Sequence, residues 1–551
     1  MKSIFLFFWS ILLPWYVSGQ LQQLEGNIRN ASNGDPVAYA TVQVEGEKLG
    51  AVSNAAGAFS LSIPQNWLTE RKILRIASIG FATQKVQLSP NDTQLEISLK
   101  EAPFTLATVY IYSTDLSARQ LVKQVFKRIA DNYPSEPYLL HTFYRHYCME
   151  NGAYGRLIEA AVDVYDRKGY NKLYAYPSKK VGMQVRQLRR SFDFTSMSFR
   201  RHLPIALNTT LLRDRASYES PLSRNLNNKK FSFAYTDTTI FDGDLVYEVS
   251  VAGKTRGRKY KAKVYIHAGD LAFIRTEESY AYVRTKDQNR FIRSDEFATT
   301  YRKRNGKYYL DHILNQGQLY DQSLGEKGEV LYSEDHYHRV ELMTNAVETE
   351  NAEPLYGKQP SAEELAVITY DPGFWDNYNV LKATPLENNI AVDLAKRMPL
   401  KQQFDQFGKD RDNPQLRDIL ANIQYRSLLR RYRGQVVLVA VWDSEYSPGL
   451  RELLLARKLI KSYKNDPIAM IFLSTDPTDA MWREAVRKKK LKLGSHLRVG
   501  NGLSSPLLQQ LGVNKTPYFL LINREGEVVL RGDKLPPAKD IQRELDAALK
   551  P

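Results

Sequence analysis

Residues 436–454, VVLVAVWDSEYSPGLRELL, form a pattern of one strand, one turn and one helix. The first seven residues are all apolar, which is typical of a strand buried on both faces. A short polar turn follows, and Pro448 is suited to the start of a helix because it has no backbone N–H to satisfy. Apolar residues at helical spacing come next. The stretch therefore predicts a strand that leads directly into an amphipathic helix.

The sequence on both sides of this unit continues to alternate helix and strand patterns. A helix is expected just before it, in PQLRDILANIQYRSLLRRY from residue 414, and a second strand after it, in IAMIFLSTD at 468–476. TPYFLLINREGEVVLRG at 516–532 predicts a hairpin, and AKDIQRELDAALK predicts a closing helix. We expect residues 413–551 to form an α/β domain with a parallel core and an antiparallel end.

This segment resembles the thioredoxin-like domain of periplasmic thiol reductases. VAVWDSEYSPGL corresponds to the active-site turn, and GVNKTPYFLLINREGEVV to the segment in which the resemblance implies a cis-proline, Pro517, after Thr516. The resemblance also implies two cysteines, at positions where this chain has Tyr446 and Gly449. Together with Trp442 and Pro448, these residues define a degenerate thioredoxin site.

The degenerate site lacks the groups that disulfide exchange requires. That reaction needs one thiolate to attack and a second thiol to resolve the mixed disulfide. A tyrosine phenol has a pKa of about 10 and no sulfur redox chemistry, and glycine has no side chain. Two interpretations stay open. The domain either lost its thiols and kept its packing, or its groove beside the cis-proline now pairs with an extended peptide.

Residues 21–100 have short alternating strands between turn clusters, which predicts a β-sandwich. The landmarks are Gly26, GDPVAYATVQVEG at 34–46, SNAAGAFSL at 53–61 and SIGF at 78–81. They resemble the carboxypeptidase-regulatory-like domain, a transthyretin-like sandwich. The resemblance implies an accessory module that packs beside other domains and catalyses nothing.

Residues 113–404 begin with an amphipathic helix, for which Asp115 or Ser117 is a candidate cap, before Pro134. Long alternating runs follow, joined by turns with Gly or Asp, and predict a central α+β domain with a curved antiparallel sheet. FYRHYCMENGAYGRLIEAAVDVYD at 143–166 and DPGFWDNYNVLKATPLENNIAVDL at 371–394 resemble the central region of exported Bacteroidota proteins that also carry the regulatory-like sandwich. The curved sheet is also similar to half-barrels that carry lipids.

The N-terminus predicts export. Lys2, the apolar run at 4–13, Pro14 and the small residues at 17–19 fit a signal peptide spanning residues 1–19. We expect the mature chain in the periplasm or cell envelope, with no transmembrane span. Its single cysteine, Cys148, has no partner for an internal disulfide, and its place in a strand pattern favours a buried, inert thiol.

The formal net charge of +16 indicates which partners to expect. In an exported protein it points away from nucleic acid and toward an anionic envelope component; an envelope protein or peptide is the other expected partner. The basic runs at 186–190, 426–433 and 483–492 each predict a solvated face.

We expect no cofactor and no metal. HRVE, from His338 to Glu341, matches a zinc pair superficially, but residues three apart in a strand face opposite sides. Glu334, His336 and His338 would share one face, for which a half-exposed polar surface is the commoner meaning.

The sequence thus predicts a multidomain, non-catalytic binding or adaptor protein of the cell envelope. Two alternatives stay open: a thiol-disulfide oxidoreductase or antioxidant relative that uses a partner's cysteine, and a lipid or lipoprotein carrier.

Overall fold

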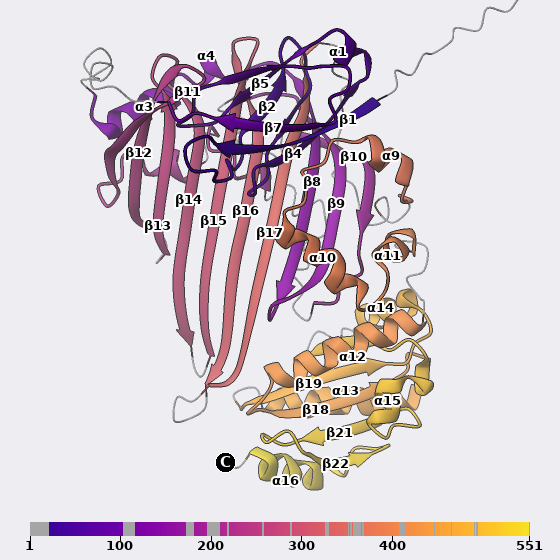
Figure 1. The fold of residues 1–551 in the computed structure, drawn as a ribbon. Helices are drawn as coiled ribbons and strands as arrows, with labels where there is room; N and C mark the ends of the chain where they lie inside the picture. The colour runs from indigo at the N-terminus through magenta and orange to yellow at the C-terminus, as the bar shows by residue number, and fades with distance from the viewer. Residues whose placement is uncertain are drawn as a thin grey trace, which may run out of the picture.

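The computed structural model contains three units that follow one another along the chain (Figure 1). An N-terminal sandwich lies across the upper part of one face of a large central sheet, and a C-terminal α/β unit lies at the lower right. The residues that the structure describes are 21–102, 116–171, 181–195, 210–217, 220–255, 258–286, 289–324, 330–350, 352, 355, 365, 368–406, 414–445, 447–463, 466–489, 491 and 494–549. The predicted signal peptide, residues 1–19, and Asp115 lie outside this set.

Two small sheets form the N-terminal sandwich. One has the order β4-β1-β7 and the other β3-β2-β5-β6. Their inward side chains form one apolar core with Phe59 fully buried. The elements are β1 (Leu21–Asn30), β2 (Thr41–Val44), β3 (Gly50–Val52), β4 (Ala58–Pro64), α1 (Asn66–Thr69), β5 (Ile73–Ala77), β6 (Gln84–Gln87) and β7 (Gln94–Leu99).

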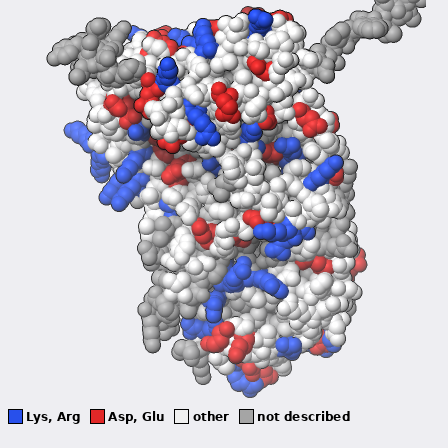
Figure 2. Space-filling model, in the orientation of Figure 1, with Lys and Arg blue, Asp and Glu red and all other residues white. Residues whose placement is uncertain are grey.

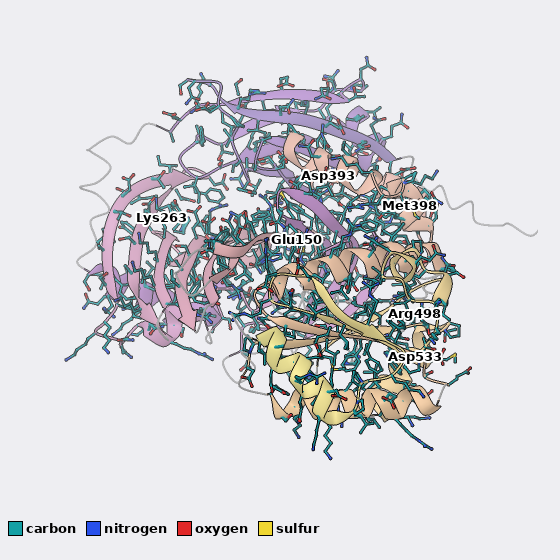
Figure 3. All side chains as sticks on the ribbon, turned by 90° about the horizontal axis from the view of Figure 1, so that it is seen from below. Glu150, Lys263, Asp393, Met398, Arg498 and Asp533 are labelled. Atoms are coloured by element: carbon teal, nitrogen blue, oxygen red, sulfur yellow. The ribbon has the colours of Figure 1, made fainter. Side chains whose placement is uncertain are left out.

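The central sheet has ten strands in the order β10-β9-β8-β17-β16-β15-β14-β13-β12-β11, and every neighbouring pair is antiparallel. Seen along its strands, the sheet is strongly curved (Figure 3). The predicted curved antiparallel sheet is confirmed. The strands are β8 (Tyr138–Glu150), β9 (Ala153–Asp166), β10 (Val181–Arg190), β11 (Ser232–Phe241), β12 (Asp244–Thr255), β13 (Arg258–His267), β14 (Ala272–Lys286), β15 (Asn289–Arg304), β16 (Lys307–Leu324) and β17 (Val330–Glu348).

The two faces of this sheet have different surroundings. On the packed face, Val249, Val264 and Ile313 join a large apolar core with helices α3 (Ala118–Lys127) and α4 (Ile129–Asn132). The other face, which we call the open face, is covered above by the sandwich and on one side by a helical segment (Figure 1). The described helices of the central unit outside the packed core are α9 (Pro372–Asn377), α10 (Pro385–Ala395) and α11 (Leu400–Gln406), while α7 (Pro221–Asn225) adds Leu222 to that core.

Helix α3 forms where the sequence predicts it. Ser117 is its cap and makes a reciprocal capping box with Gln120, which satisfies two backbone donors at the helix start. Its apolar stripe, Leu121, Val122, Val125 and Phe126, is buried. The helical path ends at Asn132, before Pro134.

The C-terminal unit has a five-stranded sheet in the order β20-β19-β18-β21-β22. Strand β18 is parallel to β19 and antiparallel to β21, so the predicted parallel core with an antiparallel end is confirmed. The elements are α12 (Pro414–Arg431), β18 (Val436–Trp442), α13 (Ser447–Ser462), β19 (Ile468–Ser474), α14 (Asp479–Lys488), β20 (Ser495–Arg498), η2 (Gly502–Ser504), α15 (Pro506–Gln510), β21 (Tyr518–Ile522), β22 (Val528–Gly532) and α16 (Ala538–Leu549). Among the described residues, no helix is both long and apolar enough to cross a membrane.

Candidate functional site

The open face of the central sheet carries a cross-strand row of nine residues, of which six are charged. Because directly opposed residues of neighbouring strands share a face, the strand register defines this row. From β12 to β10 it runs Ser250, Lys263, Glu277, Ala298, Leu314, Glu341, Arg145, Glu159 and Arg189. One end of the row is buried and the other end is open.

At the buried end, Glu159 accepts bonds from two arginines. Its oxygens lie 2.7 Å from Arg145 Nε and 2.6 Å from Arg189 Nε. Burial raises the pKa of the Glu159 carboxyl, but Arg189 and Arg145 together lower it by more, so that it stays below its usual value. Helix α10 covers this cluster and adds Glu387, 3.7 Å from Arg145. Arg189 also lies against the ring of Trp375, 4.3 Å from its centre.

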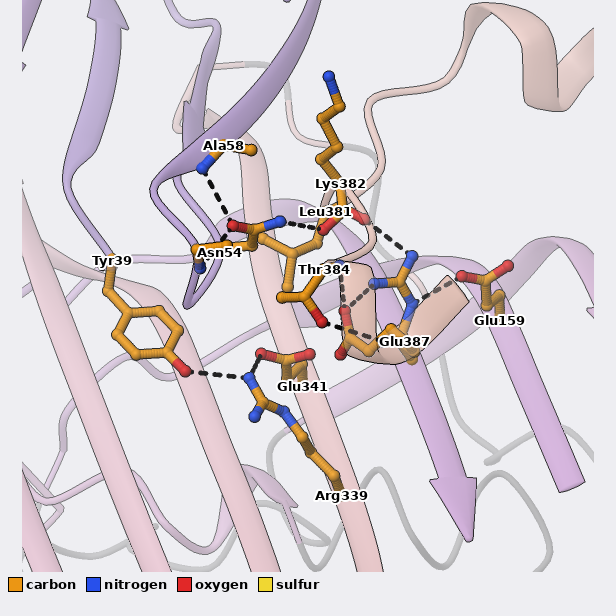
Figure 4. A network of polar contacts seen from close by, with 12 residues as sticks. Tyr39, Asn54, Ala58, Glu159, Arg339, Glu341, Leu381, Lys382, Thr384 and Glu387 are labelled. Atoms are coloured by element: carbon orange, nitrogen blue, oxygen red, sulfur yellow. Dashed lines mark hydrogen bonds and ion pairs between the residues drawn. The ribbon is translucent and has the colours of Figure 1, made fainter. Parts of the chain in front are cut away.

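The sandwich is attached to the open face by a second part of this polar network (Figure 4). Arg339 donates to the Tyr39 hydroxyl at 2.9 Å and to Glu341 at 2.7 Å. The Tyr39 ring stacks on His312, with centroids 5.3 Å apart. Tyr39 has a φ of 57°, a backbone conformation that bulky residues rarely adopt. The contacts of its side chain therefore stabilise a backbone conformation that is unfavourable for tyrosine. Asn54 donates to the Lys382 carbonyl at 2.9 Å and secures the loop before α10.

Among the described residues, two neighbouring hollows lie on the open face. The first, the aromatic hollow, lies between the sandwich and the sheet and has a volume of about 450 Å³. Its aromatic lining comes from both units, namely Tyr39, Phe81, Phe241 and Tyr265. The second, the charged hollow, spans β12 to β16, has a volume of about 480 Å³ and is lined by Lys261, Lys263, Glu296 and Gln316 among others. Arg275 and Glu277 line both hollows, so the two are neighbours.

A row of lysines begins at the charged hollow, which Lys261 and Lys263 line. Lys259, Lys261 and Lys263 alternate along β13 and so share the open face, and Lys254 of β12 lies directly opposite Lys259. We call these four residues the lysine row. Lys263 lies 3.0 Å from Glu248, whereas the described part of the chain offers no ion pair to the other three. Figure 2 shows Lys and Arg side chains gathered at the left of this view, beside β12 and β13.

The predicted degenerate site lies at the end of β18 in the C-terminal unit. Trp442 is fully buried and ends the strand. Buried Asp476 fixes the turn that follows, because it accepts a bond from the Ser444 N–H at 2.9 Å and one from the Ser474 hydroxyl at 2.7 Å. Pro448 and Gly449 belong to the first turn of α13, which begins at Ser447. Tyr446 lies outside the described residues.

The second half of that site comes from the segment before β21. The Thr516–Pro517 bond is cis, as the resemblance implied. In the register of β18 and β21, Tyr518 lies opposite Val441, which places buried Pro517 beside the end of the strand where the turn begins. The described part of the turn and the cis-proline therefore lie at the same end of the sheet.

The single cysteine lies in strand β8 of the central unit and not at this turn. Cys148 is fully buried, and Arg156 donates to its sulfur at 3.2 Å. Burial outweighs this cation and raises the pKa of the thiol to about 11. The sulfur is therefore protonated and shielded at neutral pH, which agrees with the predicted inert thiol.

Comparison with known families agrees with both ends of the fold. The profile of the CarboxypepD_reg-like domain matches residues 24–111, and a thioredoxin-like profile matches residues 434–528. The chain combines a CarboxypepD_reg-like domain with a thioredoxin-like domain. No curated protein matches the chain.

Solved structures also align with part of the chain. The thioredoxin domain of a thiol-disulfide oxidoreductase from Bacteroides vulgatus is 18% identical, over 22% of this chain and 83% of that one, with a TM-score of 0.20. A thiol-disulfide oxidoreductase from Bacteroides fragilis is 26% identical, over 21% and 84%, with a TM-score of 0.19. A thioredoxin-like protein from Parabacteroides distasonis is 22% identical, over 20% and 81%, with a TM-score of 0.19.

The histidines considered as metal ligands have other surroundings. Glu341 lies on the open face with Arg339, whereas His338, three residues earlier, lies opposite Gly317 and Cys148 in the register of β17. His336 Nδ1 is 3.1 Å from Glu150. Within the described ranges, no group of three His, Cys, Asp or Glu side chains is arranged to hold a metal ion.

Sequence reasoning missed the charged row, the lysine row and both hollows. KYKAK at 259–263 contains the signal, since lysines alternate there with residues of the core face. Of the basic runs expected to be solvated, the one at 186–190 is wrong at Arg189, which is bonded to Glu159 and stacked on Trp375.

Proposed function

We propose that this chain is a non-catalytic binding protein of the cell envelope, in which the thioredoxin-like domain is redox-inactive. The observation that carries the proposal is the location of sulfur. The turn after Trp442 keeps the strand, the helix and the cis-proline of a thioredoxin site, while the sole thiol is buried in β8. Electron-pair exchange at that turn has no sulfur to use.

The binding part of the proposal is supported by the open face. Protein sites for small ligands have volumes of about 300–1,000 Å³ and occur preferentially between domains. The aromatic hollow meets both conditions, and the charged hollow continues it across five strands. The cis-proline groove of the thioredoxin-like domain is the second candidate surface, for an extended peptide of an envelope protein.

The lining of the charged hollow also bears on the lipid-carrier alternative. Acyl chains require an apolar lining, and burial of unpaired charge beside them is costly. Lys261, Lys263 and Glu296 border this hollow, so an acyl chain bound against its largely apolar lining would lie next to charged groups.

A thiol-exchange assay tests the non-catalytic part. The purified full chain is added to insulin and dithiothreitol, and the rate of insulin reduction is followed with Cys148→Ser as the matched variant. We expect neither protein to accelerate the reaction. Acceleration that persists in the Cys148→Ser variant would overturn the proposal and favour the oxidoreductase alternative.

A further inference from the structure

We propose that the open face binds an acidic glycan, with sugar rings in the aromatic hollow and the negative charges of the chain along the lysine row. This inference rests on the proposed function as a binding protein, because it names the ligand class of that surface. It is carried by the chemistry of the two hollows and by their shared border at Arg275 and Glu277.

The lysine row gives the first reason. Like charges directly opposite each other on an antiparallel pair destabilise the sheet, and Lys254 faces Lys259 in this way. Residues two apart in a strand are about 7 Å apart, so Lys259, Lys261 and Lys263 line up at a regular spacing. All three lysines without a described ion pair, Lys254, Lys259 and Lys261, are exposed. A chain with repeated negative charges offsets this repulsion along the whole row.

The aromatic hollow gives the second reason. A sugar ring has apolar C–H faces and polar hydroxyl edges, so it packs on aromatic side chains while its hydroxyls form hydrogen bonds. The hollow supplies both kinds of partner. Tyr39, Phe81, Phe241 and Tyr265 provide rings, and the polar lining consists of Asn30, Asp35, Thr41, Ser78, Arg275, Glu277 and Thr300.

Arg275 lies between the aromatic hollow and the hollow that leads to the lysine row. Its guanidinium donates to Glu277 at 2.7 Å and to Thr300 at 3.3 Å, and it lies over the Tyr39 ring, 5.3 Å from the centre. It thus borders the hollow that would hold rings and the hollow that leads to the lysines. A single extended chain that contacts both hollows meets the Arg275–Glu277 ion pair at the junction, where the guanidinium offers N–H donors to a carboxylate of that chain.

Direct binding of three probes tests the proposal with the full-length protein. The probes are an oligogalacturonate of about ten sugars, a neutral maltodextrin of the same length and inorganic polyphosphate. We expect the oligogalacturonate to bind in low salt and to weaken in 0.5 M NaCl, and both other probes to bind at least tenfold more weakly. Polyphosphate that binds as tightly as oligogalacturonate would overturn the glycan assignment, and oligogalacturonate that binds no better than maltodextrin would overturn the role of charge.

Two variants locate the site. Lys259→Gln/Lys261→Gln should weaken oligogalacturonate binding about fivefold to tenfold, because two exposed ion pairs are lost. Its control, Lys458→Gln/Lys461→Gln, removes the same charge from exposed positions on α13 and should leave binding unchanged. Tyr265→Ala should weaken oligogalacturonate but not polyphosphate. Equal effects of the two lysine pairs would overturn the site.

The outcomes also separate this inference from the proposed function. If no probe binds and insulin reduction stays at the background rate, the glycan assignment fails while the non-catalytic reading stands. If insulin is reduced by the Cys148→Ser variant, the proposed function fails whatever the probes do.

Discussion

Replacement of Glu159 by glutamine removes the one carboxylate that Arg145 and Arg189 share beneath helix α10. Side chains of Glu159 and Arg145 are 5% and 7% exposed, so water cannot replace the lost charge. Removal of one partner from a buried ion pair costs about 3–5 kcal/mol, because the other charge stays buried. Arg145 keeps Glu387 at 3.7 Å and glutamine still accepts one bond, which favours the lower end, about 3 kcal/mol.

Hydrogen exchange measures this loss locally, which suits a chain of several units that need not unfold together. At neutral pH, amides of β8 and β9 should exchange roughly a hundredfold faster in the variant, since each 1.4 kcal/mol is a factor of about ten. Glu484→Gln on the exposed surface of α14 is the control and should not change exchange in these strands. Unchanged protection of β8 and β9 in Glu159→Gln would refute the reasoning.

The sign of the pH dependence gives the same prediction a second test. The folded pKa of Glu159 lies below its usual value, so its stabilising effect is present above the unfolded pKa of about 4.3 and is lost as pH falls through the folded pKa. Wild type and variant should therefore differ fully at pH 7 and converge only in strong acid. A difference that grows as the solution is acidified would contradict the assignment.

Three further predictions concern other parts of the chain. Because burial raises the pKa of Cys148 to about 11, iodoacetamide at pH 8 should label the folded chain about a hundredfold more slowly than the urea-unfolded chain, and equal rates would contradict the burial. Burial, together with Arg275 and Arg339, lowers the pKa of His312 to about 3, below the unfolded value of about 6.5. The free energy of unfolding should therefore fall by about 1.4 kcal/mol per pH unit between pH 6 and 4, measured by urea denaturation at each pH. His312→Leu should remove this pH dependence. A Cβ on Gly500 would clash with the backbone carbonyl of Pro414, so Gly500→Ala should cost several kcal/mol and expose residues 414–549, but not the central sheet, to limited proteolysis. Cleavage no faster than in wild type would contradict that expectation.

Local patterns explain why much of the fold could be predicted from the sequence. Strand β18 is a run of seven apolar residues, and helix α3 has a cap and a stripe, so each is determined by its own residues. Such features need no knowledge of distant contacts. The cis bond before Pro517 was instead implied by the resemblance to thioredoxin-like domains.

The open face could not be predicted because strand register decides it. Arg145, Glu159 and Arg189 come together only when β8, β9 and β10 are aligned, and a shift of one residue would turn each to the other face. The lysine row depends on the pairing of Lys254 with Lys259 in the same manner. The aromatic hollow needs the sandwich to dock, which no local pattern encodes.

Arg275 has a consequence for how tightly this surface holds an occupant. A free arginine loses considerable rotational entropy when a ligand immobilises it, and that loss weakens binding. Glu277, Thr300 and the Tyr39 ring already restrict this guanidinium before any occupant arrives. The rotational entropy of the Arg275 side chain is therefore already lost on folding and not on binding. Contacts at the junction of the hollows should thus favour slow release of a bound chain.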